Sequence, residues 1–165
     1  MYKHEVFRVN YTTYDMRRGQ DSVNIRTHPY IMALAHEDEG EDEQHPYWYA
    51  KVLGIFHVNI RISGNFDVVR MDFLWVHWFG RDPDHPGGFK KRRLHRIGLL
   101  DSTSPTSFGF LNPSDVLRAV HLIPVFSIGR TPESPGLDID EEESESDFFY
   151  VSMYSNQPYF PVHEF

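Results

Sequence analysis

The sequence has 165 residues, of which 15% are aromatic, with no cysteine and a formal net charge of -8. This length and aromatic content suit one domain with a single hydrophobic core, and the lack of cysteine excludes disulfide bonds and thiolate chemistry. No apolar run approaches the ~18 residues of a membrane-spanning helix, and the N-terminus lacks the basic-then-apolar pattern of a signal peptide. We therefore expect a soluble intracellular protein without membrane contact.

Branched and aromatic residues favour β-structure over most of the chain. Strands are expected, in chain order, at residues 5–12, 23–26, 30–35, 48–62, 68–79, 92–99, 116–125 and 148–154. The best helical signal is Asn112 followed by Pro113, a cap with proline at the first helical position, which predicts a single turn. A linker rich in proline, serine and acids, residues 132–147, separates a main domain at residues 1–131 from a last strand and tail at residues 148–165.

The two longest predicted strands, residues 48–62 and 68–79, are joined by turn-forming residues and should form a hairpin. Alternation in the first strand places one apolar set on a common face: Trp48, Ala50, Val52, Phe56 and Val58. The second strand is so rich in aromatic and branched residues that it suits a central position covered on both faces. Trp75 and Trp78 within it are three positions apart, so they should lie on opposite faces.

These elements predict a mostly β fold. Several strands, one hairpin, long acidic loops and little helix are typical of a small, partly open β-barrel.

The acidic residues are concentrated in two runs, residues 37–43 and 138–147, which hold 13 of the 24 Asp and Glu. The other eleven are outnumbered by 16 Lys and Arg, so the rest of the chain is basic. Dense runs of like charge repel themselves and are typical of exposed, solvated loops. The alternative is that these runs imitate nucleic acid and cover a basic face of this chain or of a partner.

Three segments resemble a known family: residues 46–57 (PYWYAKVLGIFH), 71–82 (MDFLWVHWFGRD) and 93–98 (RLHRIG). Together with residues 11–21, 108–113 and 118–126, they make most of residues 5–131 similar to the carboxy-terminal BAH-like β-domain of Plavaka-type transposon proteins. These belong to the CACTA group of elements in mushroom-forming (basidiomycete) fungi. The resemblance implies a BAH-like barrel, a place in the nucleus, and partners such as the transposase or chromatin. It implies no chemistry, because the transposon nuclease is a separate upstream domain.

No motif for catalysis is present: the sequence lacks a nucleophile elbow, a zinc-protease helix, a phosphate-binding loop and a dinucleotide fingerprint. Ten histidines raise the question of metal, and His77, His85 and His95 would approach one another if their strands pair. The absence of cysteine and of close histidine spacing argues against zinc. We therefore predict a non-enzymatic protein with no cofactor, no metal and no small-molecule substrate.

A basic run is the strongest local binding signal, because clustered Lys and Arg neutralise phosphates. It predicts contact with DNA or a nucleosome surface through Lys90, Lys91, Arg92, Arg93 and Arg96, extended by Arg81. The alternatives are a solvated edge, salt-bridged to the acidic loops, and a nuclear-import signal.

Aromatic residues offer a second kind of site. Tyr47, Tyr49 and Trp75 are candidates for a cage around a methylated lysine, since ring faces attract quaternary cations; the alternative is that they belong to the core. The sequence thus predicts an interaction module that contacts chromatin, DNA or the transposase. The alternatives are a reader of a modified histone or other peptide, and a purely structural domain of a larger transposon protein.

Overall fold

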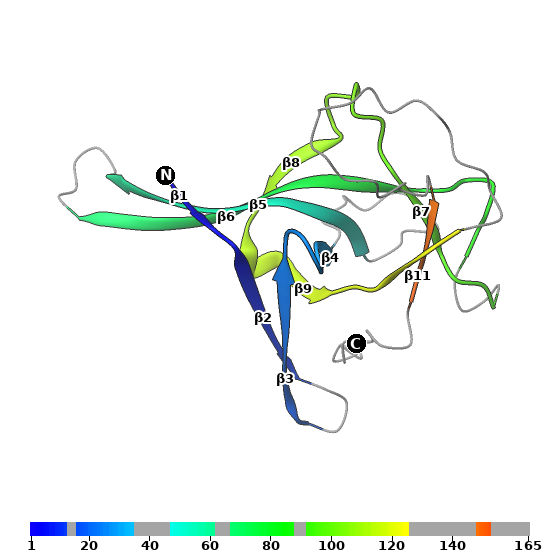
Figure 1. Ribbon diagram of the computed structural model, residues 1–165, viewed down its shortest axis with the longest axis horizontal. Coiled ribbons are helices and arrows are strands. Elements are labelled where there is room, and N and C mark those ends of the chain that lie inside the picture. The colour runs from blue at the N-terminus through cyan, green and yellow to red at the C-terminus, as the bar shows by residue number, and fades with distance from the viewer. Residues whose placement is uncertain (13–15, 35–46, 62–66, 88–91, 126–147, 153–165) are drawn as a thin grey trace, which may run out of the picture.

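The computed structural model describes residues 1–12, 16–34, 47–61, 67–87, 92–125 and 148–152. Within this part of the chain, the one helical element is a 3₁₀ turn, η1 (Pro113–Asp115), and all other regular structure is β-strand (Figure 1). The strands are β1 (Tyr2–His4), β2 (Val6–Thr12), β3 (Arg18–Asn24), β4 (Tyr30–Leu34), β5 (Tyr47–Arg61), β6 (Val68–Arg81), β7 (Arg96–Leu99), β8 (Phe108–Leu111), β9 (Val116–Ala119), β10 (Leu122–Pro124) and β11 (Phe148–Val151).

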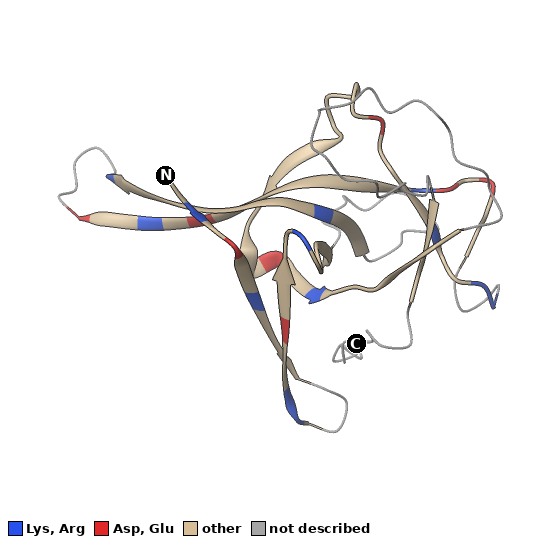
Figure 2. Cartoon of the chain, viewed as in Figure 1, with Lys and Arg blue, Asp and Glu red and all other residues tan. Residues whose placement is uncertain are grey.

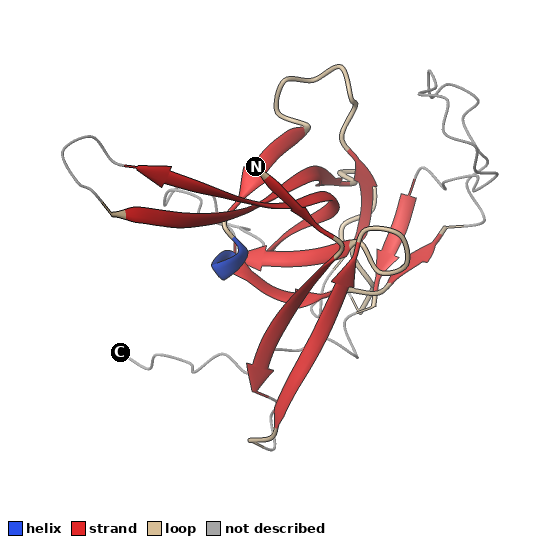
Figure 3. Cartoon of the chain, turned by 60° about the vertical axis from the view of Figure 1, so that its left-hand side comes forward, coloured by secondary structure: helices blue, strands red, loops and turns tan. Residues whose placement is uncertain are grey.

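Most of these strands form one curled sheet with the neighbour order β10-β11-β7-β6-β5-β4-β9. β1 also pairs with β5, and β8 also pairs with β6. β2 and β3 form a separate hairpin, which projects from the sheet in a different direction from the β5–β6 hairpin (Figure 3). The curled sheet amounts to half a barrel, which confirms the prediction of a mostly β, partly open barrel.

The predicted central hairpin is confirmed. β5 and β6 pair antiparallel from Ala50 opposite Trp78 to Arg61 opposite Val68, and they are the longest strands described. A shift in register between Val52 and Gly54 marks a β-bulge, which inserts one extra residue and reverses the alternation beyond it. The expectation that Phe56 and Val58 share a face with Val52 is therefore wrong.

The other strand predictions are confirmed in part. The strand at residues 30–35 and the single turn after Asn112 are present as β4 and η1, with the Asn112 side chain accepting a hydrogen bond from the Ser114 amide. The strand predicted at 23–26 is instead β3, which begins five residues earlier, and the one predicted at 92–99 begins only at Arg96. β1 and β8 were not expected from alternation, because each is very short.

Two clusters of buried side chains lie on opposite faces of the sheet. The first core joins the β2–β3 hairpin to the sheet through Val9, Val23, Ile31, Ala50, Val52, Ile55, Leu74, Val76 and Val116. The second core lies under β7, β10 and β11 and contains Met32, Tyr49, Ile97, Val120, Leu122, Phe149 and Val151. Neighbours such as Tyr49 and Ala50 belong to different cores, because successive strand residues point to opposite faces.

A buried ion pair attaches the β2–β3 hairpin to the sheet. The Asp21 carboxylate accepts hydrogen bonds from Arg118 Nε at 2.7 Å and from the Ala119 amide at 3.1 Å. The Arg118 guanidinium also lies over the Tyr11 ring, 3.4 Å from its centroid. Because only 9% of the Arg118 side chain is exposed, its charge depends on this carboxylate for compensation.

The two acidic runs and the linker at residues 132–147 lie outside the described residues. In the described part of the chain, no helix has the length and apolar content needed to span a membrane.

Removing the Asp21 carboxylate, the counter-charge of buried Arg118, should destabilise the fold. We expect Asp21→Ala to lower the free energy of unfolding by about 3 kcal/mol, because it leaves a buried guanidinium without its counter-charge. Urea unfolding followed by tryptophan fluorescence measures this change. The matched control is Asp72→Ala in the exposed pair Arg70–Asp72, where a far smaller change is expected. Equal effects of the two substitutions would contradict this account.

Candidate functional site

The β5–β6 pair has one face in the first core and an opposite face that we call the outer face. Side chains of directly opposed residues share a face, so Val52 with Val76 and Ile55 with Leu74 occupy the core side. In its middle part, beyond the second core, the outer face carries six ring-bearing residues, two of which come from β8. We call this set the aromatic platform: Phe56, Phe73, Trp75, His77, Phe108 and Phe110.

β8 brings two rings to the platform through the alternation Phe108-Gly109-Phe110. Phe108 lies opposite His77 and Phe110 opposite Trp75. The residue between them points to the core side, where a Cβ on Gly109 would lie 2.8 Å from Trp78 Nε1. Trp78 thus fills the space above Gly109, and both phenylalanines are directed outward.

The β-bulge in β5 adds a further ring. After the bulge, Phe56 faces outward and stacks on Phe73, with ring centroids 5.6 Å apart. A Cβ on Gly54 would clash with Phe56 Cε2, so the ring of Phe56 covers that glycine. Phe110 meets Phe73 edge-on at 5.5 Å, and Phe108 stacks on His77 at 4.4 Å. The rings thus form two contacting groups, Phe56–Phe73–Phe110 and Trp75–Phe108–His77, which adjoin where Phe110 lies opposite Trp75.

The platform is open to solvent. Phe110 is 74% exposed, Trp75 42% and Phe108 38%. The sequence-based expectation that this strand is covered on both faces is wrong in its middle, because the second core covers the outer face only near Tyr49 and Phe79. A contiguous exposed patch of large rings marks an interaction site more often than a solvent surface.

Two lysines border the platform. Lys3 lies opposite Phe56 and Lys51 opposite His77, so both lysines border the rings on the outer face. The four strands that build this surface, β1, β5, β6 and β8, contain one acid, Asp72, which lies on the other face opposite His57. Figure 2 shows β8 without charged residues.

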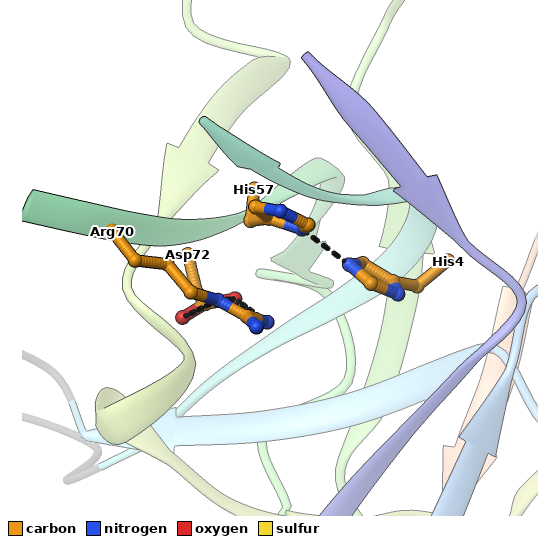
Figure 4. A network of polar contacts seen from close by, with 4 residues as sticks. All are labelled: His4, His57, Arg70 and Asp72. Carbon is orange, nitrogen blue, oxygen red and sulfur yellow. Dashed lines mark hydrogen bonds and ion pairs between the residues drawn. The ribbon is translucent and has the colours of Figure 1, made fainter. Parts of the chain in front are cut away.

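A polar cluster occupies the core side of the sheet where the first core ends (Figure 4). His4 Nε2 and His57 Nδ1 are 2.6 Å apart, and the Tyr2 ring stacks on His57 at 4.6 Å. Beside them, Arg70 and Asp72 form an exposed ion pair at 2.6 Å. Desolvation, Arg70 and His4 together lower the pKa of His57, in that order of size, whereas Asp72 opposes them. The lowered pKa favours neutral His57, whose ring nitrogen can then share a hydrogen bond with His4 between β5 and β1.

The structure describes only part of the predicted basic site. Lys90 and Lys91 lie outside the described residues, and Arg92 and Arg93 are exposed just before β7. Arg96 is instead held by Asp82, with its Nε 2.6 Å from the carboxylate, and its guanidinium lies over the Phe148 ring. Arg81 is exposed at the end of β6. Arg96 is therefore committed to a structural pair.

The three predicted cage residues are not brought together around one opening. Tyr49 is buried in the second core, where desolvation first, and then Tyr47, raise its pKa, and Tyr47 packs against the same core. Trp75 belongs to the platform, in contact with Phe108. Sequence reasoning missed the other five platform rings, and Phe-Gly-Phe alternation was the available signal for two of them.

The histidines predicted to approach one another do not gather. His77 Nε2 contacts the Leu100 carbonyl oxygen at 2.8 Å, and His85 lies against the Tyr150 ring. Among the described residues, no group of three or more His, Cys, Asp or Glu is placed to hold a metal ion.

Comparisons with protein-family models, with curated proteins and with solved structures find no match to this chain.

Acid should loosen β1. Because the pKa of folded His57 is below its ordinary value of 6.5, the attachment is complete above that pH and is lost as the pH falls toward the folded-state pKa. NMR shifts of residues 2–4 between pH 7 and pH 5 should move toward unpaired values. His57→Phe, which keeps a ring against Tyr2, should abolish this movement. Shifts that are independent of pH in the unmodified protein would refute the prediction.

Proposed function

We propose that this chain is a non-enzymatic interaction module that binds single-stranded nucleic acid on its aromatic platform. The observation that carries the proposal is the open outer face, on which Trp75 and Phe110 are 42% and 74% exposed. Unpaired bases stack on aromatic side chains presented by a sheet, whatever their sequence, because every base has a π-face.

The electrostatics support the same ligand. A single strand bound on the platform needs cations beside the rings for its phosphates. Lys3 and Lys51 border the rings at the β1–β5 side, and the one acid in the four strands points to the other face. Arg92 and Arg93, with Lys90 and Lys91, add basic charge elsewhere on the chain, which suits sequence-independent attraction to nucleic acid.

The resemblance to a BAH-like transposon domain supports a nuclear setting for this activity. In that setting the module would contact DNA, chromatin or the transposase beside the nuclease domain. Local strand separation during transposition would supply single-stranded DNA to such a platform.

A purely structural role is the second candidate, and one observation favours it. The apolar outer face continues past the rings to Val69 and Met71, which are 43% and 51% exposed. A surface of this kind also suits docking against another protein domain. The reader of a modified histone is less favoured, because Tyr49 is buried and an aromatic cage needs open ring faces.

Trp75→Ala and Phe110→Ala should each weaken binding of a fluorescent thymidine oligonucleotide by roughly 5- to 150-fold, since base stacking on a ring contributes about 1–3 kcal/mol. Fluorescence anisotropy at low salt measures the affinity. The matched control is Trp48→Ala: Trp48 is similarly exposed, at 39%, but lies on the core side against Trp78. If Trp48→Ala weakens binding as much as Trp75→Ala does, the platform is not the site.

The phosphate contacts are tested by salt. Lys3→Ala together with Lys51→Ala should reduce the log–log slope of affinity against salt by about 1.4, or ~0.7 for each lost contact with a single strand. Replacing Lys90, Lys91, Arg92 and Arg93 by alanine gives the competing measurement for the basic run. If the slope of affinity against salt falls more in that variant, the basic run, and not Lys3 and Lys51, contacts the phosphates of the nucleic acid. An unmodified protein that binds no single strand at about 50 mM salt would refute the proposed function.

A further inference from the structure

The β5–β6 hairpin extends beyond its neighbouring strands and leaves one edge of β6 open (Figure 1). On the side of β6 away from β5, β8 pairs with Leu74 to His77 and β7 pairs with Phe79 to Arg81. Among the described residues, no strand pairs with that side between Val68 and Phe73. The backbone groups of such an edge are ready to pair with another strand.

The exposed edge is also apolar on its outer face. Val69 and Met71 are 43% and 51% exposed, and Phe73 continues the same face into the platform. Natural sheets usually protect an open edge with charge, proline or a bulge. Here the edge carries two charges, Arg70 and Asp72, but they have opposite signs and lie two residues apart on the other face.

The charged and apolar residues of this β6 edge are complementary to those of a second, antiparallel copy of the same edge. In an antiparallel pair of two β6 edges with Met71 on the two-fold axis, Arg70 of each copy lies opposite Asp72 of the other. Val69 of each copy then lies opposite Phe73 of the other, on the outer face. Opposite charges and apolar pairs placed directly across strands are stabilising. Centring the pair on Arg70 or on Asp72 instead would place like charges opposite each other.

We propose that a second copy of this chain pairs with the β6 edge, centred on Met71, to form a symmetric dimer. The contact is isologous, so it closes after two copies and does not extend into a filament. Charge selects the register, and the apolar face contributes the buried area. The contact involves few residues, so it buries less area than a standard interface of roughly 1,600 Å². The dimer is therefore expected to be weak. The proposal is independent of nucleic-acid binding.

Sedimentation equilibrium of the full chain at concentrations up to about 1 mM, without nucleic acid, tests the dimer. The unmodified protein should associate reversibly to two copies. Arg70→Asp and Asp72→Arg should each weaken self-association at least about tenfold, because each places like charges opposite each other at two symmetric positions. Arg61→Asp is the matched control, since it makes the same charge change as Arg70→Asp but on β5, away from the edge.

Two further experiments, one with a double variant and one with a mixture, make the test specific to this register. The double variant Arg70→Asp, Asp72→Arg should dimerise like the unmodified chain, because the charges exchange places. The two single variants should form a heterodimer when mixed, because one edge is then wholly acidic and the other wholly basic. A chain that stays monomeric at all concentrations, or single variants that dimerise as well as the unmodified chain, would overturn the proposal.

Discussion

The register between β5 and β6 determines which side chains of this protein meet the core and which meet solvent. Before the bulge at Leu53, even-numbered residues of β5 enter the first core; after it, odd-numbered residues do. This one inserted residue lets Val52 and Ile55 both remain in the core while Phe56 turns outward onto Phe73. A β5 without the bulge would direct His57 and Asn59 to the side of Phe73 and leave the platform without one of its rings.

The platform is open because the sheet curls over only one end of the outer face. β7, β10 and β11 turn over the outer face at one end and cover Tyr49 and Phe79 with the second core. They do not reach Trp75, so the same strand carries a buried outer face at one end and an exposed one in its middle. The exposed rings contact one another, and Trp78 fills the space on the core side of Gly109.

Long, regular features of this fold could be predicted from the sequence, and local exceptions could not. The hairpin of β5 and β6, the opposite faces of Trp75 and Trp78, and the turn capped by Asn112 follow from alternation and cap chemistry. The bulge could not be predicted, because Leu53 is apolar and fits either face. The pairing of Arg96 with Asp82 depends on the tertiary fold. The sequence alone therefore could not show that one arginine of the basic run is held in an ion pair. The platform depends on β8, whose first residue, Phe108, lies 33 residues beyond Trp75, and nothing in the local sequence indicates that the two strands pair.

The geometry of an antiparallel edge contact links the two surfaces. A two-fold axis at Met71 perpendicular to the sheet keeps the outer faces of both copies on the same side. The platforms would then lie on one continuous sheet, with Phe73 of each copy next to Val69 of the other. A single nucleic-acid strand long enough to reach both platforms would bind with an avidity that neither site has alone. Weak self-association would then be sufficient, because a shared strand would hold the two copies at a high effective concentration. Long oligonucleotides would therefore be preferred over short ones more strongly than the added stacking alone explains, and that excess would disappear with Asp72→Arg, which leaves every platform ring in place.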